Sequence, residues 1–535
     1  MYSIIQKIYE KNNKILKEGL KKVLSGEDVS SLTGAIKEFT DILGKELFSE
    51  IAKQIDEIIF EDNKNNHQFE PVRFQEKSLI TKNGKSKYER RYYKDKESGE
   101  YVYLTDAVLG VDKGERIDKN VKAECIEKAN NQSYNKSGKL VVPGLDISAT
   151  TVMRNVRKNE WKYDIEERKD SKKIKSKNIY IQVDEDHIKQ RKKKGCTISK
   201  IVTIYTRKRI LTKPDRMDKV QQVRKELVDK FTFSGLYKDN QQLWEDVAYY
   251  IDCTYKKDEI EHIFIMGDGA SYIKAGTEWI EKSIFVLDLF HLEKYINHLN
   301  YDEYIKNKLQ EAIDQYDPVS TENVMNEAIA KIEEQIKEDE QLERNTKHLQ
   351  NRLKKIENTK TYLMNQWSGI EAHEKYKDKL TGCCQEGQVH HTLSERMSTD
   401  AKVWCENGID EMSQLRAFTQ NGGNIYQKII DISTQEKRNK KIEALEKRIK
   451  RKANKKIFGT TGVSIPTLAG ARDKLYYELK NIWYGKVQGN FIKYYKIVIF
   501  YEITLSESKK LLTKKISYNI MILSLMKGKN EWKNN

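Results

Sequence analysis

Acidic residues stand at the ends of two apolar runs that the sequence predicts to be buried strands. Asp184 follows Ile179–Val183, and Asp268 follows His262–Met266 after a single glycine. Ligand sites of α/β sheets form at the carboxyl ends of their strands, so neighbouring strands can bring two such carboxylates together. Glu386 precedes an amphipathic helix that can project it into the same cleft. Taken alone, each acid is also typical of a residue that caps a turn.

Three carboxylates in one cleft predict a particular kind of chemistry. Clustered carboxylates repel one another, which raises their pKa values unless a cation neutralises them. Oxygen ligands with vacant positions suit Mg²⁺ or Mn²⁺, which keep several waters and bind substrate phosphates. Two such ions, about 3.5–4 Å apart, can activate an attacking oxygen and stabilise a leaving one in phosphodiester displacement. The three acids therefore predict a centre for two divalent ions.

A second pair of residues stands beside this predicted centre. Asp288 follows the apolar run Ile284–Leu287, and His291 lies three residues later. The pair can orient a phosphate or order the groups around the metal ions. The spacing alone favours a simpler interpretation, in which Asp288 caps a helix and His291 is partly buried.

Strands that alternate with helices predict an α/β core around these residues. Further strands are expected at 201–205 and 231–236, and a helix at 240–252. Charged, glycine-poor sequence with helical periodicity occupies 292–380 and is interpreted as an insertion into the core. Within it, helices are expected at 328–339 and 341–356.

The part of the chain before the core is predicted to be helical at 1–61 and a β hairpin or meander at 70–106. A helix-turn-helix is predicted from Val121–Ala129 and Ala149–Lys158, the second helix being capped by Ser148. This second helix carries side chains suited to groove and phosphate contacts, namely Thr151, Arg154, Asn155 and Arg157. An ordinary helical hairpin is the alternative.

The charge of the chain favours a polyanionic partner. Among 535 residues, 98 Lys and Arg against 81 Asp and Glu give a net charge of +17. Cationic side chains on phosphates release condensed counterions, although a lysine-rich composition alone is the alternative. The segment 437–456 holds 11 Lys or Arg in 20 residues. It is predicted to be a solvated basic helix, which in a DNA-binding protein would contact successive phosphates of the DNA backbone. Its candidate contacts are Lys447, Arg448, Lys450, Arg451 and Lys452.

Several classes of protein are disfavoured by composition. No stretch approaches the ~18 consecutive apolar residues of a membrane span, and the start of the chain lacks a signal-peptide core. The six cysteines include no C-x-x-C pair, so neither a disulfide framework nor a structural zinc site is indicated. We therefore expect a cytoplasmic protein without a membrane partner.

The order of the motifs resembles that of bacterial insertion-sequence transposases of the ISLre-two family, which are also grouped as an uncharacterised protein family. The matching stretches are YIQVDEDHIK (180–189), GDGAS (267–271), FVLDLFHL (285–292), GCCQEGQVH (382–390), LRAF (415–418) and NGGNIY (421–426). The resemblance spans roughly residues 1–430. The tail after about residue 490 does not match the family, which raises the question of whether this copy is active.

The resemblance implies a fold and a site. The family is related to Mutator-like transposases, which have an RNase H-like catalytic fold with an all-helical insertion between the second and third acids. It implies a DDE site of Asp184, Asp268 and Glu386, and the element Asp288-x-x-His291 is similar to a signature of those relatives. The resemblance also implies that Asp184, Asp268 and Glu386 supply the ligands for two Mg²⁺ or Mn²⁺ ions.

Asp186 competes with Asp184 for the role of the first acid. The order Asp184-x-x-His187-Ile188-Lys189 resembles the Asp-x-x-Tyr-hydrophobic-Lys pattern of the relatives. This pattern favours Asp184.

We therefore expect a multidomain α+β protein with an RNase H-like α/β core. The expected divisions are an N-terminal region (1–110), a helix-turn-helix region (111–165), the first part of the core (166–300), the helical insertion (301–380), the second part of the core (381–430) and a basic helix with an unassigned tail (431–535). The expected function is a DNA transposase that binds terminal inverted repeats and target DNA as a homo-oligomer at the nucleoid. The alternatives are an RNase H-like nuclease without strand transfer and an inactive DNA-binding derivative.

Overall fold

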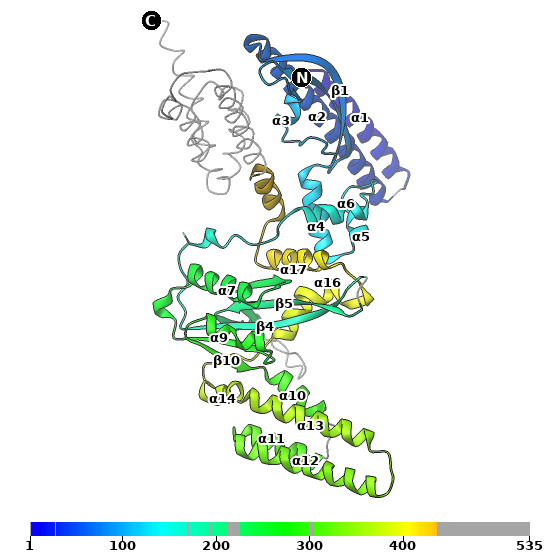
Figure 1. Ribbon diagram of the computed structural model, residues 1–535. Helices are drawn as coiled ribbons and strands as arrows, with labels where there is room; N and C mark the ends of the chain where they lie inside the picture. The colour runs from blue at the N-terminus through cyan, green and yellow to red at the C-terminus, as the bar shows by residue number, and fades with distance from the viewer. Residues whose placement is uncertain are drawn as a thin grey trace, which may run out of the picture. The chain divides into compact units, whose positions relative to one another are not determined.

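The computed structural model describes residues 2–26, 28–169, 171–191, 194–210, 225–298 and 303–435 (Figure 1). The chain divides into two compact units. The first unit contains the described residues up to Cys125, residues 138–147 and the described residues from Ile429 onward, and the second contains residues 126–137 and 148–428. The basic segment predicted at 437–456, with Lys447, Arg448, Lys450, Arg451 and Lys452, lies outside the described residues.

The first unit joins long helices to a small antiparallel sheet. Its elements are α1 (Tyr2–Leu24), α2 (Val29–Asn66), β1 (Phe69–Thr81), β2 (Gly84–Asp95), β3 (Tyr101–Val102) and α3 (Leu104–Val108). β1 and β2 pair around a turn at Asn83-Gly84, where Gly84 takes the positive φ (110°) that a glycine tolerates. Ala52, Leu79 and Tyr88 form a small core between α2 and the sheet. The helices predicted at 1–61 and the meander predicted at 70–106 are confirmed.

The two helices of the predicted helix-turn-helix are present, with a further short helix between them. They are α4 (Lys119–Asn131) and α6 (Ala149–Lys158), and α5 (Tyr134–Lys139) lies in the expected connection. The Ser148 side chain caps α6 by accepting a hydrogen bond from the Thr151 backbone N–H. Val152 and Val156 are buried, so the face that α6 turns inward is apolar.

The second unit is built on a mixed five-stranded sheet. Its strands are β4 (Asn178–Lys189), β5 (Cys196–Tyr205), β8 (Phe231–Gly235), β9 (His262–Gly267) and β10 (Ser283–Leu287), in the order β10-β9-β4-β5-β8. β4, β5 and β8 are mutually antiparallel, whereas β9 and β10 run parallel to β4. A separate ribbon pairs β6 (Arg207–Ile210) with β7 (Lys225–Val228). The fold is mixed α+β, and every strand predicted for the core is present.

One predicted strand end was wrong. The apolar run was expected to end at Val183, but β4 continues to Lys189. The extension is stabilised by antiparallel pairing with β5, whereas pairing with β9 ends at Gln182. Asp184 therefore lies within β4, at the point where the parallel part of the sheet ends.

The two faces of the sheet have separate cores. Side chains alternate between faces along a strand, so Ile181 and Val183 of β4 share one face. They pack with Trp244 and Val247 of α7 (Asn240–Thr254). Tyr180 lies on the opposite face, in a smaller cluster with residues of β5, β9 and β10. Short helices η1 (Glu166–Arg168), η2 (Lys257–Glu259), α8 (Ser271–Lys274) and α9 (Gly276–Trp279) complete this part of the unit.

Within the described residues 289–298 and 303–375, five helices form the insertion predicted at 292–380. They are α10 (Leu289–His298), α11 (Glu303–Asp314), α12 (Pro318–Gln341), α13 (Lys347–Asn365) and α14 (Trp367–Lys375). Their buried residues, including Leu309, Met325 and Ile356, are continuous with the core of the sheet. The helix predicted at 341–356 begins six residues late, because the chain reverses at 342–346 with Glu343 in a left-handed conformation.

The last described helices of the second unit follow the insertion. They are α15 (Gln385–Val389), a π-helical turn (His390–Ser394), α16 (Glu395–Met397), η4 (Thr399–Ala401) and α17 (Glu406–Gln420). Glu386 was predicted to precede a helix, but it lies in the first turn of α15. Ser413 of α17 hydrogen-bonds Ser199 of β5 (2.9 Å), which fastens α17 to the sheet.

In the parts of the chain that the structure describes, no helix combines the length and apolar character needed to cross a lipid bilayer.

Candidate active site

Three aspartates follow the last residue pairs of the parallel strands. Gln182 of β4 lies opposite Met266 of β9, so Asp184 and Asp268 both come two residues after this pair. Leu287 of β10 lies opposite Gly267 of β9, so Asp288 and Asp268 each come directly after that pair. The carboxyl end of the parallel strands, called the acidic edge below, thus carries Asp184, Asp268 and Asp288, the three aspartates that follow apolar runs in the sequence.

Asp184 occupies the most enclosed position of this group. It is 9% exposed, and its Oδ1 accepts a hydrogen bond from the Glu185 backbone N–H (2.8 Å). Burial raises the pKa of the Asp184 carboxyl to about 7; the Glu185 hydrogen bond and the charge of His291 oppose the rise, and the charges of Glu386 and Asp268 add to it. The charges of Glu386 and Asp268 therefore both reach the Asp184 carboxyl.

The Asp268 loop is held by the helical insertion. Asp268 Oδ1 accepts a hydrogen bond from Ala270 N–H (2.9 Å), which closes a turn after β9. The Tyr362 hydroxyl donates to the Asp268 carbonyl (2.7 Å), and Gln366 Nε2 donates to the Gly269 carbonyl (3.0 Å). Tyr362 and Gln366 could not be identified from the sequence, because their positions are ordinary for a helix and its end, and only the folded insertion brings them to the end of β9.

Gly269 is expected to tolerate no side chain. Its φ is +90°, and an added Cβ would lie 2.4 Å from Gln366 Cδ. We expect Gly269→Ala to destabilise the protein by about 2 kcal/mol or more, since strain and a clash combine, and to displace Asp268. Urea denaturation measures the loss. Gly387→Ala is the matched control, because nothing lies within 4 Å of its added Cβ, and equal stability of the two variants would contradict the expectation.

Asp288 and His291 form an ion pair at the start of α10. Asp288 Oδ2 lies 2.9 Å from His291 Nδ1, and Asp288 Oδ1 accepts a longer bond from Phe290 N–H (3.3 Å). The simpler interpretation from the sequence is therefore confirmed, since Asp288 caps α10 and His291 is partly buried beside it. The hydrogen bond to Asp288 raises the pKa of His291, burial opposes the rise, and Asp184 adds to it.

Glu386 faces this pair from another element. Its side chain is 56% exposed, and Glu386 Oε1 lies 3.8 Å from His291 Nε2. The segment before it is fastened to the sheet, because Cys384 Sγ donates to Gln182 Oε1 (3.2 Å) and Thr381 Oγ1 hydrogen-bonds the Tyr205 hydroxyl (3.0 Å). α15 thereby packs on β4 and directs Glu386 toward the edge that holds Asp184.

Asp186 has a different environment from Asp184. Its Oδ2 accepts hydrogen bonds from Ser394 Oγ (3.1 Å) and from Ser398 Oγ. Asp186 therefore anchors the helix that follows Glu386. This engagement favours Asp184 as the first acid.

The donor set fits hard divalent cations. Within the described residues, no three or more His, Cys, Asp and Glu side chains are close enough together, as they stand, to hold a metal ion. Asp184, Asp268 and Glu386 nevertheless offer carboxylate oxygens, which Mg²⁺ and Mn²⁺ prefer. Burial raises the pKa of Asp184, so a bound cation would stabilise the charged form of its carboxyl group.

The predicted DNA-contacting residues of α6 divide into two groups. Arg154 is exposed, whereas Thr151 and Asn155 are half-buried. Arg157 is engaged internally, with Nε 3.4 Å from Glu411 Oε2 and Nη2 donating to Cys405 Sγ (2.7 Å). Arg157 thus holds α6 on α17, and Arg154 is the candidate better placed for a phosphate.

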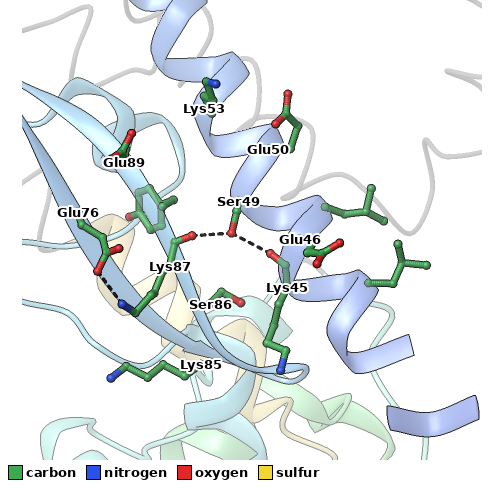
Figure 2. A pocket seen from close by; sticks show the side chains of 13 residues that line it. Lys45, Glu46, Ser49, Glu50, Lys53, Glu76, Lys85, Ser86, Lys87 and Glu89 are labelled. Carbon is green, nitrogen blue, oxygen red and sulfur yellow. Dashed lines mark hydrogen bonds and ion pairs between the residues drawn. The ribbon is translucent and has the colours of Figure 1, made fainter. Parts of the chain in front are cut away.

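The described residues border a hollow in each of the two units. One of about 270 Å³ is bordered by Asp288, His373 and Cys383, next to the candidate site. A larger one, of about 480 Å³, lies in the first unit between α2 and the β1–β2 hairpin (Figure 2). Its lining alternates lysines with glutamates, and Lys87 pairs with Glu76 (3.0 Å). The described lining of the larger hollow thus mixes both charges, and this mixture favours neither an anion nor a cation as ligand.

Comparison with known proteins agrees on one family. The model of UPF0236, described as an uncharacterised protein family, matches residues 22–430. Two UPF0236 proteins of Caldanaerobacter subterraneus subsp. tengcongensis are similar over most of their length. One is 32% identical over 478 residues, covering 86% of this chain and 94% of the relative. Another is 33% identical over 479 residues, covering 86% of this chain and 93% of the relative.

Proposed function

The chain belongs to the uncharacterised protein family UPF0236, and from this premise we propose that it is a DNA transposase of an insertion sequence. The observation that carries the proposal is the acidic edge of the sheet, where the charges of Glu386 and Asp268 add to the raised pKa of Asp184. Three carboxylates around one edge are suited to metal-assisted phosphodiester chemistry.

The proposed fold of the catalytic core is RNase H-like. The sheet supports it, because three antiparallel strands are followed by two that run parallel to the first, of which β9 pairs with β4 and β10 pairs with β9. The helical insertion between Asp268 and Glu386 agrees with the resemblance noted from the sequence.

Each residue of the site has a role in the proposed reaction. Asp184, Asp268 and Glu386 would hold two Mg²⁺ or Mn²⁺ ions, which activate an attacking oxygen and stabilise a leaving one when bound. His291, whose pKa is raised by its hydrogen bond to Asp288, is placed to orient a phosphate. Water attacks the phosphorus at an element end, the P–O3′ bond breaks, and a 3′-OH is released. That hydroxyl then attacks a phosphorus of target DNA: a new P–O3′ bond joins the element end to the target, the target's own P–O3′ bond breaks, and a 3′-OH of the target strand is released.

DNA binding is proposed for two regions of the chain. α6 and the basic segment 437–456 would bind the terminal inverted repeats, in a homo-oligomer assembled on DNA. The net charge of +17 supports a polyanionic partner. The proposed location is the bacterial cytoplasm, at the nucleoid.

A strand-transfer assay tests the proposal. We expect the purified protein with Mg²⁺ to join pre-cleaved element ends to a plasmid, and Asp268→Asn to bind the same ends without nicking or joining. Cleavage without joining would instead indicate a nuclease. Binding that is independent of Mg²⁺, with no scission, would indicate an inactive DNA-binding derivative.

A further inference from the structure

A turn of π-helix interrupts the helix that carries Glu386. Between α15 and α16, the Glu395 N–H bonds the His390 carbonyl five residues earlier, instead of a carbonyl four residues earlier. A single π-helical turn accommodates one extra residue within an α-helix and is frequent at functional sites. The turn therefore changes the side of the helix on which the residues before it lie.

The π-turn determines on which side of the helix Glu386 lies relative to Ser394. Ser394 comes eight positions after Glu386. In a regular α-helix, at about 100° per residue, the two side chains would therefore lie about 80° apart around the axis. When the π-turn absorbs one residue, the effective spacing is seven residues and the angle falls to about 20°. Ser394 contacts Asp186 of β4, and Glu386 lies near Asp184 of the same strand. The π-turn therefore lets one side of the helix contact both positions of β4.

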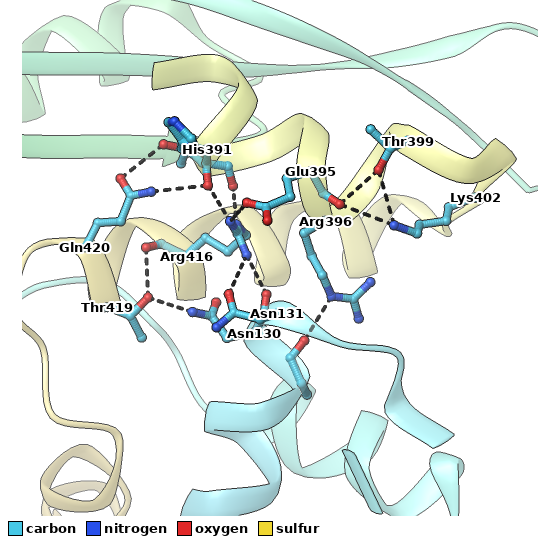
Figure 3. A network of polar contacts seen from close by, with 12 residues as sticks. Asn130, Asn131, His391, Glu395, Arg396, Thr399, Lys402, Arg416, Thr419 and Gln420 are labelled. Atoms are coloured by element: carbon cyan, nitrogen blue, oxygen red, sulfur yellow. Dashed lines mark hydrogen bonds and ion pairs between the residues drawn. The ribbon is translucent and has the colours of Figure 1, made fainter. Parts of the chain in front are cut away.

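A buried arginine holds the turn in this form. Arg416 of α17 is 5% exposed, and its guanidinium donates to the His391 and Thr392 carbonyls, both within the turn (Figure 3). It also donates to the Asn130 carbonyl and to Asn131 Oδ1 (3.1 Å). Burial lowers the pKa of Arg416, so these acceptors compensate a charge that burial disfavours.

We propose that Arg416 is a positioning residue for the third acid. By holding two consecutive carbonyls of the π-turn, it prevents the segment from relaxing to a regular α-helix, in which Glu386 would rotate by about 100°. The inference rests on the proposed function only in assigning Glu386 to the reaction.

Arg396 supplies a matched control. It is also 5% exposed, donates to the Ala129 carbonyl (2.9 Å) and lies over the Trp404 ring. Its guanidinium does not contact the carbonyls of the π-turn. Replacing either arginine by methionine removes a buried cation, but only Arg416→Met releases the turn.

The first test compares these two variants. We expect Arg416→Met to lower the Mg²⁺-dependent nicking rate by about 100-fold and Arg396→Met by less than about tenfold, at equal folded fraction. Crystal structures of both variants locate residue 386 independently of activity. Equal effects on nicking, or Glu386 unmoved in Arg416→Met, would overturn the proposal. If the wild-type protein does not nick DNA, the proposed function fails, and the crystal structures still decide the role of Arg416.

A deletion provides the second test. After removal of the exposed His390, Ser394 comes seven positions after Glu386, and a regular α-helix places residues at this spacing on the same side without a π-turn. We expect the deletion alone to retain activity. Combined with Arg416→Met, it should raise the nicking rate at least about tenfold above that of Arg416→Met alone. Absence of rescue in a folded double variant would mean that Arg416 acts only on stability.

Discussion

Asp184→Asn is expected to reduce Mg²⁺-dependent cleavage by on the order of 10³-fold or more, which corresponds to about 4 kcal/mol of transition-state stabilisation. The amide keeps the shape of the carboxyl group but loses the charge that would hold a cation. Binding of DNA ends should be unchanged, because Asp184 is buried at the edge of the sheet. Single-turnover nicking and a filter-binding assay measure the two properties.

Asp186→Asn is the matched control for this substitution. Asp186 lies on the same strand and the same face, but Ser394 and Ser398 donate to it. An asparagine Oδ1 still accepts such a bond, so we expect activity to fall by less than about tenfold. The opposite result, a large loss for Asp186→Asn and a small one for Asp184→Asn, would assign Asp186 as the first acid.

Asp184→Asn is also expected to stabilise the metal-free protein at neutral and higher pH. The pKa of Asp184 is raised from 3.8 to about 7, so the folded state binds a proton that the unfolded state releases. Stability from this group is therefore present below about pH 4 and is lost as the pH rises to about 7. The raised pKa of His291 acts in the same direction. Glu386 and Asp268, which face Asp184, add to the effect.

The size of this effect follows from the shift. At 1.36 kcal/mol per pKa unit, the stability gained by Asp184→Asn should grow by up to about 3 kcal/mol between about pH 5 and about pH 8. Urea denaturation in the presence of a chelator measures it, with Asp186→Asn as the control. Mg²⁺ should then stabilise the wild-type protein more than Asp184→Asn. A gain independent of pH would contradict the raised pKa.

Much of the core is encoded locally. The runs before Asp184, Asp268 and Asp288 are apolar and β-branched, so each predicts a buried strand with an acid near its end. The register is set by the pairing, in which Asn178–Gln182 of β4 lie opposite His262–Met266 of β9. Ser148 likewise predicts the start of α6, since a cap needs only the residues beside it. The function assigned to these residues remains a proposal.

Contacts between distant segments were not predictable in this way. The interval between Asp186 and Ser394, and that between Asn130 and Arg416, spans more than 200 residues. Nothing in the residues around Arg416 indicates a buried cation, and helical periodicity from Glu386 onward does not reveal a π-turn.

The sequence by itself determined which strands form and which acids stand near their ends, because hydrophobic periodicity and caps act over a few residues. Only the tertiary structure decided that β4 continues past Asp184, that the insertion holds the Asp268 loop, and that Arg416 fixes the turn after Glu386. Those features depend on hydrogen-bond partners that only the folded chain brings together, and a buried donor or acceptor is stable only where such a partner is found.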